Sequence, residues 1–460
     1  MGITPSPPRP PRPRRPAAEY ASRAAAQASA LYAHRDAAAF LDGALSALDL
    51  APDPPEALRL DLMCRLVSAL AHAGEVERAL DARAKALTVA RRTADPKAVA
   101  RAAVAFDAPV IWTIQPERRL DRDLVHAVED AIPRETGERR CLLLVTLCHA
   151  VEGHDGARVE TASAEAVAIA RDIGDPHLLC MALNARYWAC QAPDRREELE
   201  GLGHELLRVS SSAGLLGYQT LGHAALCMVA LSRNDWAGAR HHADQAAEHS
   251  TSGQLGHALG ILAFLDALHL LLRGEFEQAE EAYTTLGKRM AESGASISSL
   301  MGAVGCFAVR LAAGRFDECV EAITPVWERI PQEVEELYAR ALVAAGRLEE
   351  ARAVWPAALP RRDFSWVGMM AARSMTAIAL ADREAAGECY RRLLPVEGEM
   401  AGMSTASVTF GPVAHTLGDL AVFLGGSEAA AGHYARAVEV ARQVGSPHWE
   451  KAARDALARL

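Results

Sequence analysis

Apolar and polar positions alternate along this chain in a repeated unit of two helices. The clearest copy runs from Leu268 to Tyr283, where an apolar stretch leads to Gly274 and a second stretch with helical periodicity follows. Glycine suits the position just after a helix, because the backbone there turns left-handed. Ala279 is small enough to let the second helix lie close to the first. The pattern predicts packed helix pairs, each with an apolar face that a neighbouring pair must cover.

The same unit occurs along most of the chain, as a turn residue followed five positions later by a small or apolar residue. The copies are Gly74 with Ala79, Asn234 with Ala239, Gly274 with Ala279, Gly314 with Cys319, Gly346 with Ala351, Ala381 with Ala386, Gly425 with Ala430, and a weaker one, His154 with Val159. The turn positions step by 80 and then 40 up to residue 314, and by 32, 35 and 44 afterwards. We therefore predict an all-α fold, a right-handed α-solenoid of tetratricopeptide-like helix pairs with about 10 or 11 repeats.

A second motif marks the far end of the unit. It reads Ala-Arg-Asp-Ile-Gly-Asp-Pro at 170–176, Ala-Arg-Gln-Val-Gly-Ser-Pro at 441–447 and Ala-Arg-Arg-Thr-Ala-Asp-Pro at 90–96. Gly174 can end one helix, Asp175 can cap the next, and Pro176 suits a first helical turn, where no N–H donor is needed. In each copy the proline lies 22 residues after its turn position, so both motifs share one frame.

The remaining segments divide the chain only weakly. Residues 1–16 are rich in Pro and Arg and predict a disordered tail, with a basic arm for nucleic acid or an acidic partner as the alternative. Residues 17–460 form the predicted array, which is interrupted near 106–118, 356–363 and 395–412. The last interruption is long enough for a mobile loop. In the first, Trp112 is interpreted as packed inside the connection, with an interface anchor as the alternative.

The net charge and the cysteine content limit the partners and the cellular location that we expect. The net charge of −10, with only four lysines, argues against direct nucleic acid binding by the repeat array, because phosphate contacts need clustered basic side chains. Nine scattered cysteines form no Cys-x-x-Cys pair, and the sequence begins without an apolar signal segment. The longest apolar run is too short for a membrane span. We expect a cytoplasmic protein that is not associated with a membrane.

The sequence lacks the usual arrangements of catalytic residues. The phosphate-binding Gly-x-x-x-x-Gly-Lys-Ser/Thr loop is missing, because the only Gly-Lys, at 287–288, is followed by Arg. His241, Asp244 and Glu248 share a helical face and could supply metal ligands, but a polar outer face explains them more simply. We therefore predict no enzymatic activity, no catalytic or metal-binding residues and no cofactor.

The concave side of the array is the remaining candidate for binding. Counting back from a degenerate turn near Asp194 places Met181, Asn184, Trp188 and Gln191 on that side. The amides could bond a peptide backbone while Trp and Met supply apolar contact. The corresponding positions of the next pair are all apolar, so a place in the helical core is the alternative interpretation.

Three stretches carry a family resemblance. They are Ala-Arg-Asp-Ile-Gly-Asp-Pro at 170–176, Arg-Gly-Glu-Phe-Glu-Gln-Ala at 273–279, and Ala-Val-Glu-Val-Ala-Arg-Gln-Val-Gly-Ser-Pro-His-Trp at 437–449. They resemble the tetratricopeptide-like C-terminal half of large actinobacterial transcriptional regulators, the ATP-binding LuxR-type and antibiotic-regulatory-protein groups related to the maltose regulator. The resemblance covers residues 17–460.

The resemblance implies a sensor. In that family the repeats sense an inducer or a partner and regulate an ATPase module and a DNA-binding module elsewhere in the chain, and neither module is recognisable in this sequence. We expect a scaffold for a protein or peptide partner or a small-molecule inducer, with a regulatory role linked to transcription. It would act alone, with a separate regulator, or as part of a longer one. Two alternatives are DNA binding through the N-terminal arm and an enzyme with a cryptic site in the solenoid.

Overall fold

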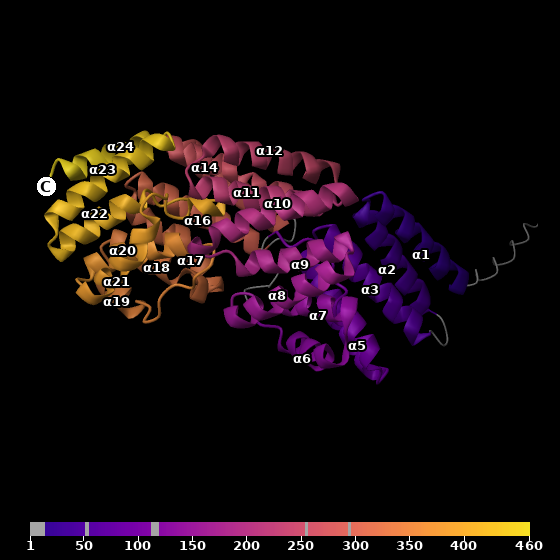
Figure 1. The fold of residues 1–460 in the computed structure, drawn as a ribbon. Helices are drawn as coiled ribbons and strands as arrows, with labels where there is room; N and C mark the ends of the chain where they lie inside the picture. The colour runs from indigo at the N-terminus through magenta and orange to yellow at the C-terminus, as the bar shows by residue number, and fades with distance from the viewer. Residues whose placement is uncertain (1–13, 51–54, 112–118, 254–255, 293–295) are drawn as a thin grey trace, which may run out of the picture.

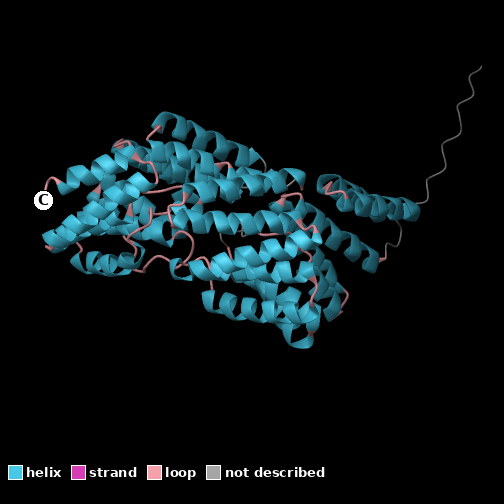
Figure 2. Ribbon diagram, turned by 45° about the horizontal axis from the view of Figure 1, so that its top comes forward, coloured by secondary structure: helices cyan, strands magenta, loops and turns pink. Residues whose placement is uncertain are grey.

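The computed structural model describes residues 14–50, 55–111, 119–253, 256–292 and 296–460. Residues 1–13 of the predicted tail and Trp112 lie outside this part of the chain. Figures 1 and 2 show an elongated, helical molecule with the N-terminal helices at one end and the C-terminus at the other. The described residues form no β-strand, and an isolated antiparallel bridge joins Met400 to Pro412.

The helices follow one another in pairs. The first twelve are α1 (Arg14–Ala30), α2 (His34–Asp49), α3 (Glu56–His72), α4 (Val76–Arg92), α5 (Pro96–Ala103), α6 (Arg122–Ala131), α7 (Gly137–Val151), α8 (Gly156–Ile173), α9 (Pro176–Ala189), α10 (Arg196–Ala213), α11 (Leu216–Ser232) and α12 (Trp236–Ser252). The others are α13 (Gly256–Leu262), α14 (Phe264–Arg273), α15 (Phe276–Glu292), α16 (Ser296–Ala312), α17 (Cys319–Arg329), α18 (Pro331–Ala344), α19 (Leu348–Ala353), α20 (Trp366–Ala379), α21 (Arg383–Leu393), α22 (Val413–Leu424), α23 (Ser427–Gln443) and α24 (Pro447–Leu457).

Almost all helices that are consecutive in the chain pack against each other, and helices two apart also touch, as α7 with α9 and α18 with α20. Each pair therefore buries its apolar face against the next one. The predicted all-α solenoid of helix pairs is confirmed.

The predicted turn positions set the frame of the array. The backbone is left-handed at Gly74, Asn234, Gly274, Gly314, Gly346, Ala381 and Gly425. The residue five positions after each of them is completely buried, with 0% of its surface exposed. The prediction of a turn at His154 is wrong by one position, because Gly153 adopts the positive φ of 77°. Glycine reaches this conformation without the strain that a side chain would add.

The second motif works as the sequence predicts in its best copy. Gly174 ends α8 with a φ of 77°, and the carboxylate of Asp175 accepts a 2.7 Å hydrogen bond from the N–H of Leu178. Pro176 then opens α9. In the last copy Ser446 makes no such cap, and its hydroxyl lies 3.3 Å from Nδ1 of His448.

Ion clusters join successive pairs on the same frame. Glu160 accepts hydrogen bonds from Arg186 and Arg195, and Glu198 pairs with both arginines. A corresponding cluster stands 120 positions later, where Glu280, Arg315 and Glu318 replace Glu160, Arg195 and Glu198, and Arg310 supplies the other guanidinium. Because these side chains are partly exposed, each pair is worth only about 0 to 1 kcal/mol. The clusters mark the repeat more than they stabilise it.

An irregular segment between α21 and α22 packs inside the array. We call residues 397–412 the inserted segment. It folds back on itself, since the N–H of Phe410 donates to the carbonyl of Ala401 at 2.9 Å. Met400, Met403 and Thr409 are at most 1% exposed. The expectation of a mobile loop at 395–412 is therefore wrong about its surroundings, because most of these residues lie in the interior.

Contacts with distant helices hold the inserted segment in place. Tyr283 of α15 donates a 2.7 Å hydrogen bond to the carbonyl of Ser407, and Arg196 of α10 forms an ion pair with Glu399. The amide of Asn234, a turn residue, donates to the carbonyl of Gly398 at 2.7 Å. Segments up to 203 positions apart thus enclose one interior.

The last helix also returns to the middle of the array. In α24, His448 lies above Gly274, where a Cβ atom would come within 3.2 Å of its Nδ1. The same ring meets Phe276 edge to face at 5.1 Å between centroids. Figure 1 shows α24 beside α14. The C-terminal part of the chain therefore packs back against the middle of the array, around the buried inserted segment.

Candidate functional site

Three pockets among the described helices adjoin the inserted segment. The first lies between α9, α11, α13 and α14, the second between α16, α18, α20, α22 and α24, and the third between α16, α18 and α20. Thr405 stands between the first and third pockets, and Phe410 between the second and third. With their openings to solvent they measure about 670, 1100 and 780 Å³, of which about 50, 350 and 100 Å³ is free space inside the walls. Only the second reaches the size of roughly 300 Å³ or more that pockets for small molecules commonly have.

The four predicted partner-binding residues all lie on α9 or just after it, and all are buried. Met181 is 6% exposed and belongs to the core of the N-terminal half. Asn184 is bound to the backbone of Val110, since its side chain accepts from the N–H at 2.7 Å and donates to the carbonyl at 2.9 Å. Trp188 donates to the same carbonyl at 3.2 Å.

The described part of the interruption, residues 106–111, thus packs against α9. Val110 is 3% exposed, and the hydroxyl of Tyr218 lies 3.4 Å from the carbonyl of Asp107. The amide of Asn184 therefore forms with the chain's own backbone the hydrogen bonds that the sequence predicted for a bound peptide. A peptide could reach it only by displacing Val110.

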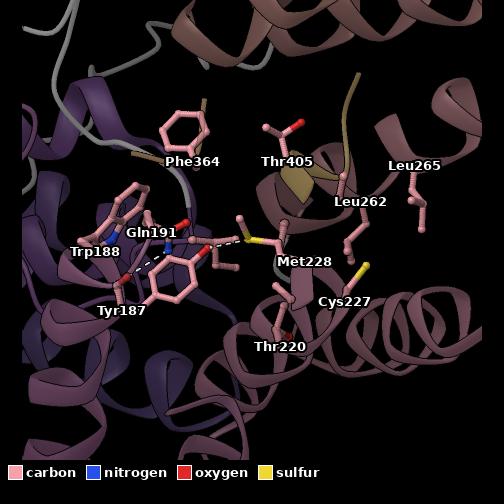
Figure 3. A pocket seen from close by; sticks show the side chains of 14 residues that line it. Tyr187, Trp188, Gln191, Thr220, Cys227, Met228, Leu262, Leu265, Phe364 and Thr405 are labelled. Carbon is pink, nitrogen blue, oxygen red and sulfur yellow. Dashed lines mark hydrogen bonds between the residues drawn. The ribbon is translucent and has the colours of Figure 1, made fainter. Parts of the chain in front are cut away.

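Two of the four predicted residues, Trp188 and Gln191, line the first pocket, which is shown in Figure 3. Trp188 and Gln191 form part of its wall, opposite Met228, Leu262 and Thr405. Its lining is mostly apolar and comes from segments as far apart as Ile111 and Ala406.

Polar atoms in the first pocket are mostly engaged within the protein. The hydroxyl of Tyr187 donates to Sδ of Met228 at 3.2 Å, and that of Thr405 donates to the carbonyl of Gly402 at 2.8 Å. The amide of Gln191 donates to the carbonyl of Tyr187 at 3.0 Å, which leaves its oxygen without a partner among the described residues. This oxygen is the natural acceptor for a ligand N–H or O–H.

Cysteine chemistry does not extend to this pocket. All nine cysteines are free, and burial raises the pKa of Cys227, which lines the first pocket, to about 12. A thiol rather than a thiolate is present near neutral pH, and the thiolate is the reactive form. Cys227 therefore acts as a small apolar wall residue.

The second pocket is the most polar of the three. Arg340 of α18, His415 and Asp419 of α22, and His448 of α24 share its wall with aromatic rings. Burial lowers the pKa of His415 below its usual value and that of His448 to about 4, so both rings are neutral near pH 7. The sequence did not suggest these residues, since they are separated by 108 positions and only the folded array gathers them.

The histidines considered for metal binding lie elsewhere. His241 packs beside His242 with 5.3 Å between ring centroids, and Nδ1 of His242 is 3.1 Å from Nδ1 of His223. Within the described ranges no group of three or more His, Cys, Asp or Glu side chains is placed to hold a metal ion. No described helix combines the length and hydropathy that a bilayer span requires.

The comparisons with known proteins add little to this picture. No family model matches the chain, and no curated protein matches it. Among solved structures the chain is similar to a "circular tandem repeat protein with novel repeat topology and enhanced subunit contact surfaces", with 13% identity over 97% of both chains and a TM-score of 0.14. A score this low supports no argument about the fold, which therefore rests on the helix pairs themselves. The chain is a helical-repeat scaffold, an architecture suited to binding proteins.

Proposed function

We propose that this protein is a sensor module, a helical-repeat scaffold that binds a small apolar molecule in the first pocket and passes that signal to a protein partner. The main observation that supports this proposal is the first pocket. Its wall combines α9, α11, α13 and α14 with residues near 111, 364 and 406, so a ligand there would join segments that lie far apart in the sequence. Binding that favours one arrangement of such a wall shifts the population of the whole scaffold.

The filled interior favours a small ligand over an extended peptide. Val110 occupies the amide of Asn184, and the inserted segment fills the space between the pockets. The ligand would be largely apolar, in keeping with the lining, and would carry one donor for the side-chain oxygen of Gln191. A protein partner would then bind the outer surface of the array, where the charged side chains are exposed.

The regulatory role follows from the resemblance to actinobacterial transcriptional regulators. What supports it is the shared repeat motif at 170–176 and 437–449 together with a mostly apolar pocket between the helix pairs. We propose a binding protein rather than an enzyme, located in the cytoplasm and linked to transcription.

Phenylnaphthylamine, a neutral apolar fluorophore with one N–H donor, tests the pocket. We expect it to bind the full-length protein and brighten, and we expect Ala224→Phe, which projects a ring into the pocket, to weaken binding at least tenfold. Ala237→Phe on the exposed surface of α12 is the matched control. If Ala224→Phe does not fold, Gln191→Leu replaces it and should weaken binding about tenfold, the cost of one hydrogen bond. Unchanged binding in a folded variant would refute the assignment.

Transcript profiling tests the regulatory part. A strain that lacks the protein and a strain that carries Ala224→Phe should show changes in the same set of transcripts, because both have lost the signal. The Ala237→Phe strain should match the wild type. Unrelated sets of transcripts, or no change in either strain, would contradict a sensor linked to transcription.

A further inference from the structure

The second pocket differs from the first in containing an arginine, Arg340, whose charge is balanced only at a distance, by Asp419 on the same wall. Arg340 makes no ion pair or hydrogen bond with the described residues, and burial lowers the pKa of its guanidinium. Arginines on the adjoining helices are paired, since Arg310 of α16 meets Glu280 and Arg373 of α20 meets Glu336. A guanidinium removed from water without a directly paired anion is costly to the fold. Such a cost is typical of groups kept for binding.

The remaining polar groups of the second pocket leave Arg340 as its source of positive charge. His415 and His448 are neutral near pH 7, and each has a buried ring nitrogen that no described residue bonds, Nδ1 in His415 and Nε2 in His448. Asp419 is engaged by the hydroxyl of Tyr434, which donates to it at 2.7 Å. The carboxylate of Asp419 also lies 3.8 Å from Nε2 of His415, and it attracts Arg340 through space without a direct ion pair between the two described side chains.

The rest of the wall is aromatic and aliphatic. Phe307, Phe410 and Trp449 line the pocket together with Met375. Flat, apolar bodies pack well against such rings. The space of about 1100 Å³, which includes its opening to solvent, is the largest of the three.

We infer that the second pocket binds a small organic acid, with its anionic group on Arg340 and a ring-bearing apolar body against Phe307, Phe410 and Trp449. A planar guanidinium can hold a carboxylate through two parallel hydrogen bonds. Asp419 directs the anionic group toward Arg340 and away from α22, and it accepts a hydroxyl or amino substituent of the ligand. This site is separate from the first pocket and takes a different class of molecule.

Two fluorophores with the same aromatic body test the inference. Anilinonaphthalene sulfonate carries an anionic group, and phenylnaphthylamine lacks it. In the full-length protein, Arg340→Met should weaken binding of the sulfonate at least tenfold and leave binding of the neutral amine within twofold. Arg347→Met is the matched control, because Arg347 lies three residues after α18 and pairs with Glu350 on the surface. Sulfonate binding within twofold of wild type in Arg340→Met would overturn the inference.

Stability gives an independent reading. Since Arg340 is half-buried and makes no direct ion pair with the described residues, Arg340→Met should keep or raise the melting temperature, whereas loss of a structural arginine would lower it. A lowered melting temperature would show a structural role and count against the site. If Arg340→Met fails to fold, Arg340→Gln serves for the binding assay.

The two pockets are separated by the first-pocket variant. Ala224→Phe should leave sulfonate binding within twofold of wild type, so failure of the proposed sensor function and failure of the acid site are distinguishable. Loss of sulfonate binding in Ala224→Phe would place the probe in the first pocket and refute the second.

Discussion

The helix pairs that form the walls and the inserted segment that enters the interior are built differently. In the walls, neighbouring helices meet through small residues. At the contact of α15 with α16, a Cβ atom on Gly302 would lie 2.7 Å from the carbonyl oxygen of Tyr283. The inserted segment instead depends on single polar side chains that reach backbone groups, such as the bond from Tyr283 to Ser407.

This difference explains which parts of the fold can be predicted from the sequence. Wall contacts recur with the repeat, so each one appears in the sequence several times, as with the completely buried residue after each turn. The polar contacts occur once each and join residues far apart, as Asn184 and Val110, 74 positions from each other. The following substitutions test whether irregular segments really depend on such single contacts.

Arg373 is expected to show the largest effect. It is buried in α20, forms a 2.7 Å ion pair with Glu336, and donates to the carbonyls of Pro356 and Ala358 in the interruption that follows α19. Arg373→Met should lower the free energy of unfolding by about 3–5 kcal/mol, because Glu336 and two carbonyls lose their partner. Urea unfolding followed by circular dichroism measures the loss.

An exposed arginine nearby provides the control for that substitution. Arg352 of α19 pairs with Glu349 at the surface. Arg352→Met should cost no more than about 1 kcal/mol. Equal losses in the two variants would mean that the buried pair is not special.

Asn184 comes next in size. Asn184→Leu keeps a similar volume but leaves the N–H and carbonyl of Val110 without the amide. The expected loss is roughly 3 kcal/mol, since each buried backbone group left unpaired costs about 1–3 kcal/mol and Trp188 still serves the carbonyl. Thermal and urea unfolding report it.

Gln191→Leu is the counterpart of that variant. Its amide donates to the carbonyl of Tyr187, one helical turn earlier in the chain. We expect a cost of about 1 kcal/mol or less. If Gln191→Leu lowered the free energy of unfolding as much as Asn184→Leu, the hydrogen bonds to Val110 would not explain the loss in Asn184→Leu.

A wall contact should give the smallest effect of the three. Gly302→Ala places a methyl group against the backbone of α15, which cannot move aside as a side chain would. Overpacking of this kind costs about 1–3 kcal/mol, and we expect a value near 2 kcal/mol because helix propensity offsets part of it. Gly201→Ala on α10, where a Cβ meets no atom within 4 Å, should instead leave stability unchanged or raise it. A neutral Gly302→Ala would show that these helices are not in close contact.

For the candidate site, the sequence placed two of four residues on a pocket. Trp188 and Gln191 reach the first pocket because the helical period sets which side of α9 they occupy. Asn184 lies on the same side, but only the fold reveals that Val110 already uses its amide. Arg340 could not be found from sequence, because an arginine without a partner differs from a paired one only through its surroundings.

What the sequence alone determined is the local and periodic part of the structure. Gly274, Ala279 and the Gly174-Asp175-Pro176 turn fix where helices end, begin and approach one another, since these properties depend on backbone strain, side-chain size and capping within a few residues. Tertiary structure decided the rest. The inward path of the inserted segment and the pockets it separates depend on contacts between residues more than a hundred positions apart, made once each, and no repeat or spacing in the chain records them.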